Sequence, residues 1–140
     1  MIGVEPELAA DARDSLRSGQ RVAWPAEDTQ RTIADALRVE QVGALPLQHM
    51  LSQVDDIVTV TDDEIREAVR RIAAQAHLVA EPGGAVAVAA CLLPGHDLPP
   101  ARTRVAVLSG GNIEPALLAG ILAGDAPGPG GPGADGPAPE

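Results

Sequence analysis

The sequence of 140 residues contains no lysine, no tyrosine and no phenylalanine, and Trp24 is its only aromatic residue. All ten basic residues are therefore arginines. Chemistry that requires a lysine amine from this chain is excluded, and so are the aromatic surfaces on which nucleic-acid bases stack. Large aromatic interface anchors are also missing, so the hydrophobic core must be aliphatic.

Cysteine and positive charge are scarce as well. The single Cys91 cannot form an internal disulfide, which fits a reducing cytoplasm and removes cysteine-based zinc sites. It lies in an apolar run, and we expect it to be buried. Twenty acidic residues against ten basic ones give a net charge of −10. Such a surface repels phosphate backbones, so binding to nucleic acid is not expected.

No hydrophobic run is long enough to cross a membrane. The longest, residues 84–93, has about half of the roughly 20 residues that a spanning helix needs. The first ten residues carry Glu5 and Glu7 where a signal peptide would have a basic start and an apolar block. We therefore expect a cytoplasmic protein without a membrane-spanning segment.

Residues 124–140 consist only of glycine, proline, alanine and three acids. Such a segment cannot bury enough apolar surface to offset the entropy lost on ordering. We expect a disordered acidic tail after a domain at residues 1–123. Without the three tail acids the balance is 10 − 17 = −7, so the ordered part is itself acidic.

The clearest structural signal lies at residues 57–77. A short β-branched run at 57–60 predicts a buried strand. Thr61 and Glu64 then have the spacing of a capping box. Apolar residues recur every three or four positions, which predicts a helix that ends near His77. The expected ion pairs on its exposed face are Asp62 with Arg66 and Glu67 with Arg71.

The remaining pattern predicts an α/β fold. Its expected elements are a helix at 82–93 buried nearly all round, a strand at 105–108, a helix at 115–123 capped by Gly124, and helical patches at 9–17 and 46–53. This order favours a partial open parallel sheet with flanking helices.

One candidate site is the turn that follows the expected strand at 105–108. Ligands of open parallel sheets bind beyond the carboxyl ends of the strands, where Ser109 would stand. Gly110 and Gly111 let the backbone approach a flat ligand, and the hydroxyl can bond one ring heteroatom. The alternative is a glycine-rich strand-to-helix turn with a local serine hydrogen bond.

A second candidate combines Glu5, Ala9 and Asp11. Two carboxylates with a backbone carbonyl between them suit Mg²⁺ or Ca²⁺. The alternative is a solvated helix start. The three histidines have no ligand spacing, and the sequence contains no phosphate-binding loop, HExxH or serine-histidine-aspartate order.

Four motifs occur in the order and spacing of one family: Thr-Ile-Ala-Asp at 32–35, Val-Asp-Asp-Ile-Val-Thr-Val-Thr-Asp-Asp-Glu-Ile at 54–65, Glu-Pro-Gly-Gly-Ala at 81–85 and Leu-Ser-Gly-Gly-Asn at 108–112. On these motifs, residues 2–123 resemble the C-terminal part of the pyridoxal-phosphate-dependent serine/threonine dehydratases. This family includes threonine ammonia-lyase and serine racemase and has fold type II, as in the tryptophan synthase β subunit.

The resemblance implies pyridoxal phosphate as cofactor and elimination of water from a hydroxy amino acid, followed by release of a 2-oxo acid and ammonia. The serine of the turn matches the residue that bonds the pyridine nitrogen. The matching cofactor positions are Ser109, Gly110, Gly111 and Glu81, and the matching cation positions are Glu5, Ala9 and Asp11.

Two positions depart from the family pattern, because Gly83 stands where Ser or Thr is usual and Ala36 where glycine is usual. More importantly, the family's N-terminal half supplies the cofactor-anchoring lysine, an asparagine at the ring and the phosphate loop. We therefore expect no catalytic residue here and no activity of the chain alone.

Residues 2–6 match a strand end inside the family's large domain, so a sheet neighbour is expected to be missing. The expected partner is an N-terminal half-enzyme or a second copy of the chain. The alternatives are a non-catalytic interaction module and a self-sufficient acidic α/β domain.

Overall fold

The computed structural model describes residues 1–124. The expected tail lies outside the described residues, apart from Gly124, and the domain boundary stays a prediction. None of the helices in the described part is both long and apolar enough to span a lipid bilayer.

Two short parallel strands, β1 (Ile2–Pro6) and β2 (Asp56–Val60), form the sheet of the described part. Their register places Val4 beside Val58. The connection between them is helical and contains α1 (Asp11–Ser18), α2 (Ala26–Thr29), the 3-10 turn η1 (Asp35–Leu37) and α3 (Ala44–Gln53). The fold is thus α/β with a small parallel sheet, as predicted.

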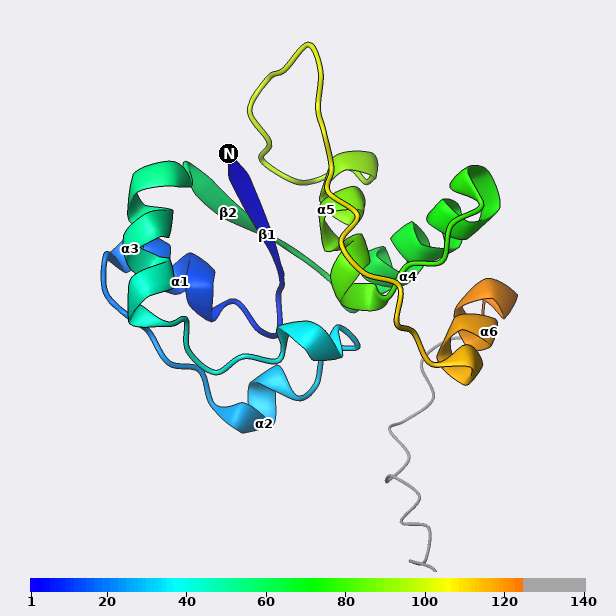
Figure 1. The fold of residues 1–140 in the computed structure, drawn as a ribbon, viewed down its shortest axis with the longest axis horizontal. Helices are drawn as coiled ribbons and strands as arrows, with labels where there is room; N and C mark the ends of the chain where they lie inside the picture. Colours follow the sequence, from blue (N-terminus) through cyan, green and yellow to red (C-terminus); the bar gives the residue numbers. More distant parts are fainter. Residues whose placement is uncertain (125–140) are drawn as a thin grey trace, which may run out of the picture.

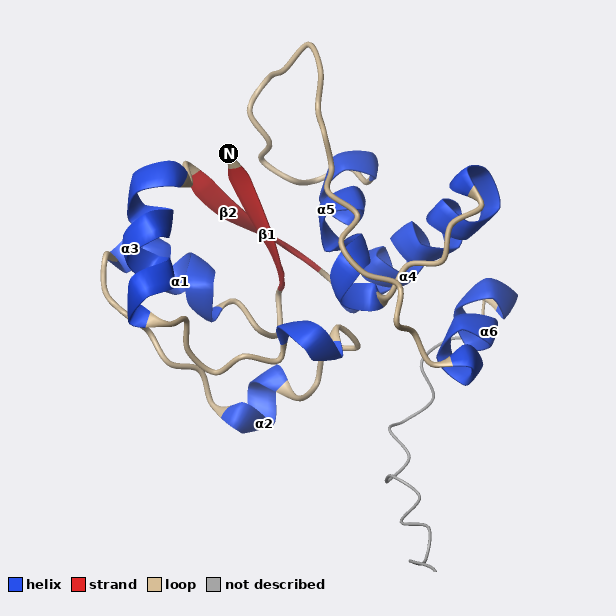
Figure 2. Ribbon diagram, viewed as in Figure 1, coloured by secondary structure: helices blue, strands red, loops and turns tan. Residues whose placement is uncertain are grey.

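Three further helical segments follow β2. They are α4 (Asp62–Arg71) with its π-helical continuation η2 (Ile72–Ala76), α5 (Pro82–Leu92) and α6 (Pro115–Ala123). In the view of Figure 1, α1 to α3 lie on one side of the two strands and α4 to α6 on the other, and Figure 2 shows how few residues are in strands. The predicted ends at His77 and Gly124 are confirmed, because both residues adopt the left-handed conformation that ends a helix.

The core lies where α4 and α5 pack together beside the sheet. Its fully buried members are small or aliphatic, as a chain without Phe and Tyr requires: Val60, Ile65, Ala68, Val69, Ala85 and Ala89. The capping box at the start of α4 is confirmed. The amide of Glu64 donates to Thr61 Oγ1 (3.2 Å), and the amide of Thr61 donates to Glu64 Oε2 (2.7 Å).

The predicted strand at 105–108 is wrong for the described residues. This segment has no regular secondary structure, and the residues Val105 and Val107 are 85% and 68% exposed. A strand is defined by the neighbour to which its backbone is bonded. Nothing within residues 1–124 pairs with this segment, so its β-branched composition alone does not make it a strand.

Two further expectations about side chains are wrong. Asp62 does not pair with Arg66, because its carboxylate instead accepts hydrogen bonds from the segment that begins at Thr32. The pair of Glu67 with Arg71 is confirmed. Helix α5 is not covered all round, since Cys91 is only partly buried and Leu92 is 49% exposed. Of these two residues, Cys91 lines a hollow of the surface between α5 and β1.

Candidate functional site

The turn at residues 109–112 packs against the start of helix α5. The amide of Glu81 donates to the carbonyl oxygen of Gly110 (3.0 Å), and the amide of Asn112 donates to Glu81 Oε2 (2.9 Å). One residue therefore bonds the turn through both its backbone and its carboxylate. The structure brings the four predicted cofactor residues to one place and gives Glu81 the role of holding the turn.

Close packing explains the glycines of this site. A Cβ on Gly110 would lie 2.5 Å from Glu81 Oε1, and one on Gly111 would lie 2.8 Å from the carbonyl oxygen of Val79. A Cβ on Gly84 would lie 2.6 Å from the carbonyl oxygen of Gly110. The sequence analysis missed Gly84. Its only signal is a glycine inside the first turns of a helix, where alanine is about 1 kcal/mol more favourable.

The hydroxyl of Ser109 is free to bond a ligand. The residue is exposed, and its side chain makes no hydrogen bond within residues 1–124. The local serine bond that the alternative interpretation requires is therefore not formed. Ser109 directly follows the extended segment 105–108 and stands beside the turn that Glu81 holds.

The two departures from the family pattern face each other. A Cβ on Gly83 would lie 3.4 Å from the Cβ of Ala36 and 3.5 Å from Cγ of Leu37, which is ordinary van der Waals contact. The extra methyl group at position 36 thus lies where a larger side chain at position 83 would point. The two positions therefore lie within van der Waals contact of each other at the start of α5.

The Thr-Ile-Ala-Asp motif is fixed to the start of α4. Thr32 Oγ1 donates to Asp62 Oδ1 (2.6 Å), and the amide of Ile33 donates to Asp62 Oδ2 (3.0 Å). The amide of Ala34 donates in turn to Thr32 Oγ1 (3.2 Å). These bonds position the segment that carries Ala36 against helix α5.

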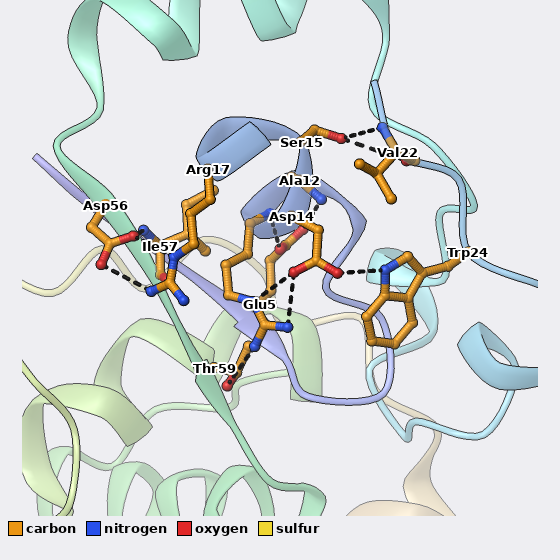
Figure 3. Close-up of polar contacts among 11 residues, drawn as sticks. Glu5, Ala12, Asp14, Ser15, Arg17, Val22, Trp24, Asp56, Ile57 and Thr59 are labelled. Atoms are coloured by element: carbon orange, nitrogen blue, oxygen red, sulfur yellow. Dashed lines mark hydrogen bonds and ion pairs between the residues drawn. The ribbon is translucent and has the colours of Figure 1, made fainter. Parts of the chain in front are cut away.

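The candidate cation residues lie at the start of helix α1, on the other side of the strands. The Glu5 carboxylate accepts hydrogen bonds from the amides of Ala12 (3.3 Å) and Arg13 (2.8 Å), as Figure 3 shows. Ala9 and Asp11 are 1% and 2% exposed. The helix start is therefore buried and capped by a carboxylate, and the alternative of a solvated helix start does not hold.

Burial changes the acidity of both carboxyl groups. Desolvation raises the pKa of Glu5 to about 7, the two amide bonds oppose this shift, and the charge of Asp11 adds to it. Desolvation also raises the pKa of Asp11, because burial disfavours the charged form of its carboxyl group. Asp11 Oδ2 is buried and has no hydrogen-bond partner in the described part of the chain. A cation between the two carboxylates would relieve both costs.

The number of side-chain ligands at this site is small. The described residues contain no group of three His, Cys, Asp or Glu that could hold a metal ion. A cation bound here would therefore need the carbonyl oxygen of Ala9 and water in addition to Glu5 and Asp11. Oxygen-only coordination of this kind suits Mg²⁺ or Ca²⁺.

Helix α1 is held in place by neighbouring polar contacts. Asp14 accepts hydrogen bonds from Arg13 Nε (3.0 Å) and from Nε1 of Trp24 (3.1 Å). Arg17 forms a two-pronged ion pair with Asp56 at the start of β2, with distances of 3.1 and 3.0 Å. These contacts fix the amide groups that Glu5 caps.

Known proteins share both the sequence and the structure of this chain. It is 33% identical over 129 residues to L-threo-3-hydroxyaspartate ammonia-lyase of Saccharomyces cerevisiae and 35% identical over 112 residues to serine racemase of Schizosaccharomyces pombe. These matches cover 92% and 80% of the chain. The crystal structure of threonine deaminase from T.th. superposes with a TM-score of 0.73 at 38% identity and covers 81% of the chain.

The chain spans little more than a third of these relatives. The three matches cover 38%, 33% and 39% of the respective relatives' lengths. The sequence model of the family described as "Pyridoxal-phosphate dependent enzyme" matches residues 1–110. The chain belongs to this family of pyridoxal-phosphate-dependent enzymes.

Proposed function

We propose that this chain is the C-terminal, ring-binding section of a pyridoxal-phosphate-dependent ammonia-lyase acting on a hydroxy amino acid such as serine or threonine. The observation that carries the proposal is the turn at 109–112: Glu81 bonds this turn, Gly84 packs against it, and the Ser109 hydroxyl has no hydrogen-bond partner within residues 1–124. The proposal also holds that the chain alone is inactive and needs an N-terminal polypeptide section.

The residues present fit the ring of the cofactor. Gly110 and Gly111 let the turn pack closely against Glu81 and Val79, and Ser109 beside them offers a neutral hydroxyl to a ring nitrogen. The Glu81 carboxylate accepts a hydrogen bond from the Asn112 amide and lies against Gly110. Ser109 would thus bond the ring, and Glu81 would fix the turn that supports it.

The residues present do not fit covalent attachment of the cofactor. The sequence contains no lysine. The lysine amine that would attach the cofactor covalently must therefore come from another polypeptide section. The phosphate group also lacks a glycine-rich cradle in this sequence. Ring binding in this chain and anchoring elsewhere explain why the two sections would depend on each other.

Bound pyridoxal phosphate supplies an electron-accepting ring that stabilises negative charge at the carbon next to the substrate amine. The contribution of Ser109 is to bond the ring nitrogen without a formal charge. A neutral partner does not keep this nitrogen protonated as a carboxylate would, which makes the ring a weaker electron acceptor. A ring that accepts electrons more weakly is consistent with elimination of a hydroxyl group from the carbon next to the one that bears the substrate amine.

We also propose that Glu5, Asp11 and the carbonyl oxygen of Ala9 bind Mg²⁺ or Ca²⁺. The support is the unpartnered Asp11 Oδ2 beside a second buried carboxylate. A cation there would fix the connection between β1 and α1 and take no part in the reaction.

The test adds pyridoxal phosphate to the purified chain alone, to the chain with the N-terminal section of the T.th. threonine deaminase, and to both sections joined in one polypeptide. Absorbance titration measures cofactor affinity, and a coupled assay measures the 2-oxo acid formed from L-serine and L-threonine. We expect activity only when both sections are present. Turnover by the chain alone, or an inactive joined polypeptide, contradicts the proposal.

The variant Ser109→Ala in the joined polypeptide tests the role of the hydroxyl. We expect the cofactor affinity to fall about tenfold, the equivalent of one hydrogen bond to a ligand. Ser52→Ala is the matched control, since Ser52 is exposed on α3 and bonds only its own helix and Gln53. Equal affinities of the two variants would show that Ser109 does not touch the ring.

The second candidate function is a non-catalytic module that binds another subunit through its open surface. The exposed residues Val105 and Val107 favour it, because exposed aliphatic segments promote association. This module would bind a partner without any gain in cofactor affinity, so the titration described above separates the two functions.

A further inference from the structure

A small polar recess lies beside strand β2, between helix α1 and the loop that follows α5. Its volume is about 220 Å³. Drug-sized ligands occupy sites of about 300–1,000 Å³, so the recess suits a smaller molecule. The polar side chains that line it come from α1, from β2 and from the loop: Arg13, Arg17, Asp56, Thr59, His96 and Asp97. None of them belongs to the turn at 109–112 or to the candidate cation set.

The charges of the recess balance each other. Two arginines, Arg13 and Arg17, face two aspartates, Asp56 and Asp97, across a single small volume. An anion would be attracted by the first pair and repelled by the second, and a cation would meet the reverse. A ligand that carries both charges and no net charge matches such a lining better than either ion does.

The hydrogen-bond donors of the recess are held in place but not used up. Arg17 donates to Asp56 through Nε (3.1 Å) and Nη2 (3.0 Å), as Figure 3 shows, and Nη2 also donates to the carbonyl oxygen of Ile57 (3.3 Å). Its third nitrogen, Nη1, has no partner within residues 1–124. Arg13 Nη1 donates to Thr59 Oγ1 (3.4 Å), which leaves the hydroxyl proton of Thr59 to be donated in turn.

The backbone of Thr59 adds a donor and an acceptor. The carbonyl of Val60 accepts from the amide of Glu7, so Val60 directs its carbonyl group toward β1. Because alternate residues of a parallel strand point to its two edges, the amide and carbonyl of Thr59 point to the other edge, where the recess lies. On the same edge, neighbouring side chains already bond the amide and carbonyl of Ile57. Thr59 is therefore the position at which this edge can bond a ligand.

The loop side of the recess supplies a carboxylate and a buried imidazole. Asp97 is exposed and makes no hydrogen bond or ion pair in the described part of the chain, so its carboxylate can accept from a ligand. The side chain of His96 is only 9% exposed. Its Nε2 lies 3.1 Å from Glu64 Oε1 but is not aligned for a hydrogen bond, and it has no other partner among the described residues. A buried polar atom without a partner is costly, and a polar ligand in the recess would relieve this cost.

We propose that this recess binds a free α-amino acid, with its carboxylate on Arg17 and the Thr59 hydroxyl and its ammonium group on Asp97. An α-amino acid carries both charges on one carbon and is small enough for the volume. Inorganic phosphate would satisfy the donors but would lie against Asp97, and a peptide terminus carries only one of the two charges. The amino acid is held as an effector that links α1 to the loop after α5. This inference does not rest on the proposed function, because the recess lies wholly within residues 1–124.

The experiment titrates the ¹⁵N-labelled 140-residue chain at pH 7 and constant ionic strength, without cofactor, and follows its amide resonances by NMR. The probes are glycine, N-acetylglycine, which lacks the ammonium group, glycine methyl ester, which lacks the carboxylate, and inorganic phosphate. We expect glycine to shift the amides of Thr59 and residues 95–97 in a saturable way, with a dissociation constant in the millimolar range. The other three probes should bind at least about tenfold more weakly, the equivalent of one lost charged hydrogen bond.

Two variants test the assigned contacts. Asp97→Asn alters an exposed side chain, and we expect it to weaken glycine binding at least about tenfold and to make glycine and N-acetylglycine equal. Arg17→Lys keeps a positive charge beside Asp56 but removes the unpaired guanidinium nitrogen, and should also weaken glycine binding. Asp63→Asn is the matched control, because Asp63 is exposed and does not line the recess, and it should leave the affinity unchanged.

Four outcomes would overturn the inference: no saturable shift at Thr59 and residues 95–97, binding of N-acetylglycine as tight as that of glycine to the unaltered chain, tighter binding of phosphate than of glycine, and equal affinities of Asp97→Asn and Asp63→Asn for glycine. The second and third would make the recess a site for anions. Failure of the proposed function is distinguishable, because glycine binding is measured on the chain alone and needs neither cofactor nor turnover.

Discussion

Replacing Gly84 by alanine tests the contact between helix α5 and the turn at residues 109–112. The new Cβ would lie 2.6 Å from the oxygen and 2.7 Å from the nitrogen of Gly110, and both atoms belong to the backbone. No side-chain rotation can relieve this contact. Either the turn or the start of α5 must move, and the bond between the Glu81 amide and the Gly110 carbonyl is strained in both cases.

The magnitude follows from opposing effects. Overpacking of a tight contact costs about 1–3 kcal/mol, and loss of one hydrogen bond costs about 1 kcal/mol. Alanine offsets about 1 kcal/mol of this through its higher helix propensity. We therefore expect Gly84→Ala to lower the free energy of unfolding by about 1–3 kcal/mol.

The neighbouring Gly83 provides the control, since a Cβ there makes ordinary contacts at 3.4 and 3.5 Å. Gly83→Ala should raise the free energy of unfolding by up to about 1 kcal/mol, because only the helix propensity changes. Urea unfolding followed by circular dichroism measures both variants. If Gly84→Ala stabilises the chain as much as Gly83→Ala does, the turn is not packed on α5 and the reasoning about the site is wrong.

Three further predictions concern the remaining structure. Thr61→Ala removes the hydroxyl that caps α4 and should cost about 1 kcal/mol in urea unfolding, whereas an unchanged midpoint would refute the role of the capping box. Ile65→Ala leaves a cavity at a fully buried position and should cost about 2–5 kcal/mol, and a loss below about 1 kcal/mol would mean that α4 is not packed as described. The pKa of Glu5 is raised to about 7 in the folded chain, above its ordinary value of 4.5, so the protonated form favours folding. Without added cation, stability is therefore full below pH 4.5 and falls as the pH rises through 7, by roughly 2 kcal/mol between pH 5 and 8. Glu5→Gln should remove this slope, and wild-type and variant curves that stay parallel would contradict it.

Signals that depend only on neighbouring residues predicted the fold well. Thr61 and Glu64 satisfy each other's backbone within one helical turn, so the start of α4 could be placed from their spacing. The left-handed end at Gly124 needs only a residue without Cβ. The strand at Asp56–Val60 was also predicted correctly. Its β-branched residues are buried by the helices that pack against it.

Features that depend on distant partners were not predictable from the pattern. The run at 105–108 has the composition of a strand, yet residues 1–124 supply no neighbouring strand to which its backbone could bond. Asp62 has an arginine four positions away and bonds Thr32 instead, thirty positions away in the sequence. The sequence pattern did not show the role of Gly84, which depends on its contact with the backbone of Gly110.

Helix α5 contacts both the turn at 109–112 and the hollow beside β1. Its first turns support the Ser109 turn through Gly84, and its later residues Ala87 and Ala90 form the floor of the hollow. Anything that steadies this helix from one end reduces the conformational entropy still to be lost at the other. Thermodynamic linkage makes the effect mutual, so a ligand bound at the turn and one bound in the hollow would tighten each other's binding by the same factor.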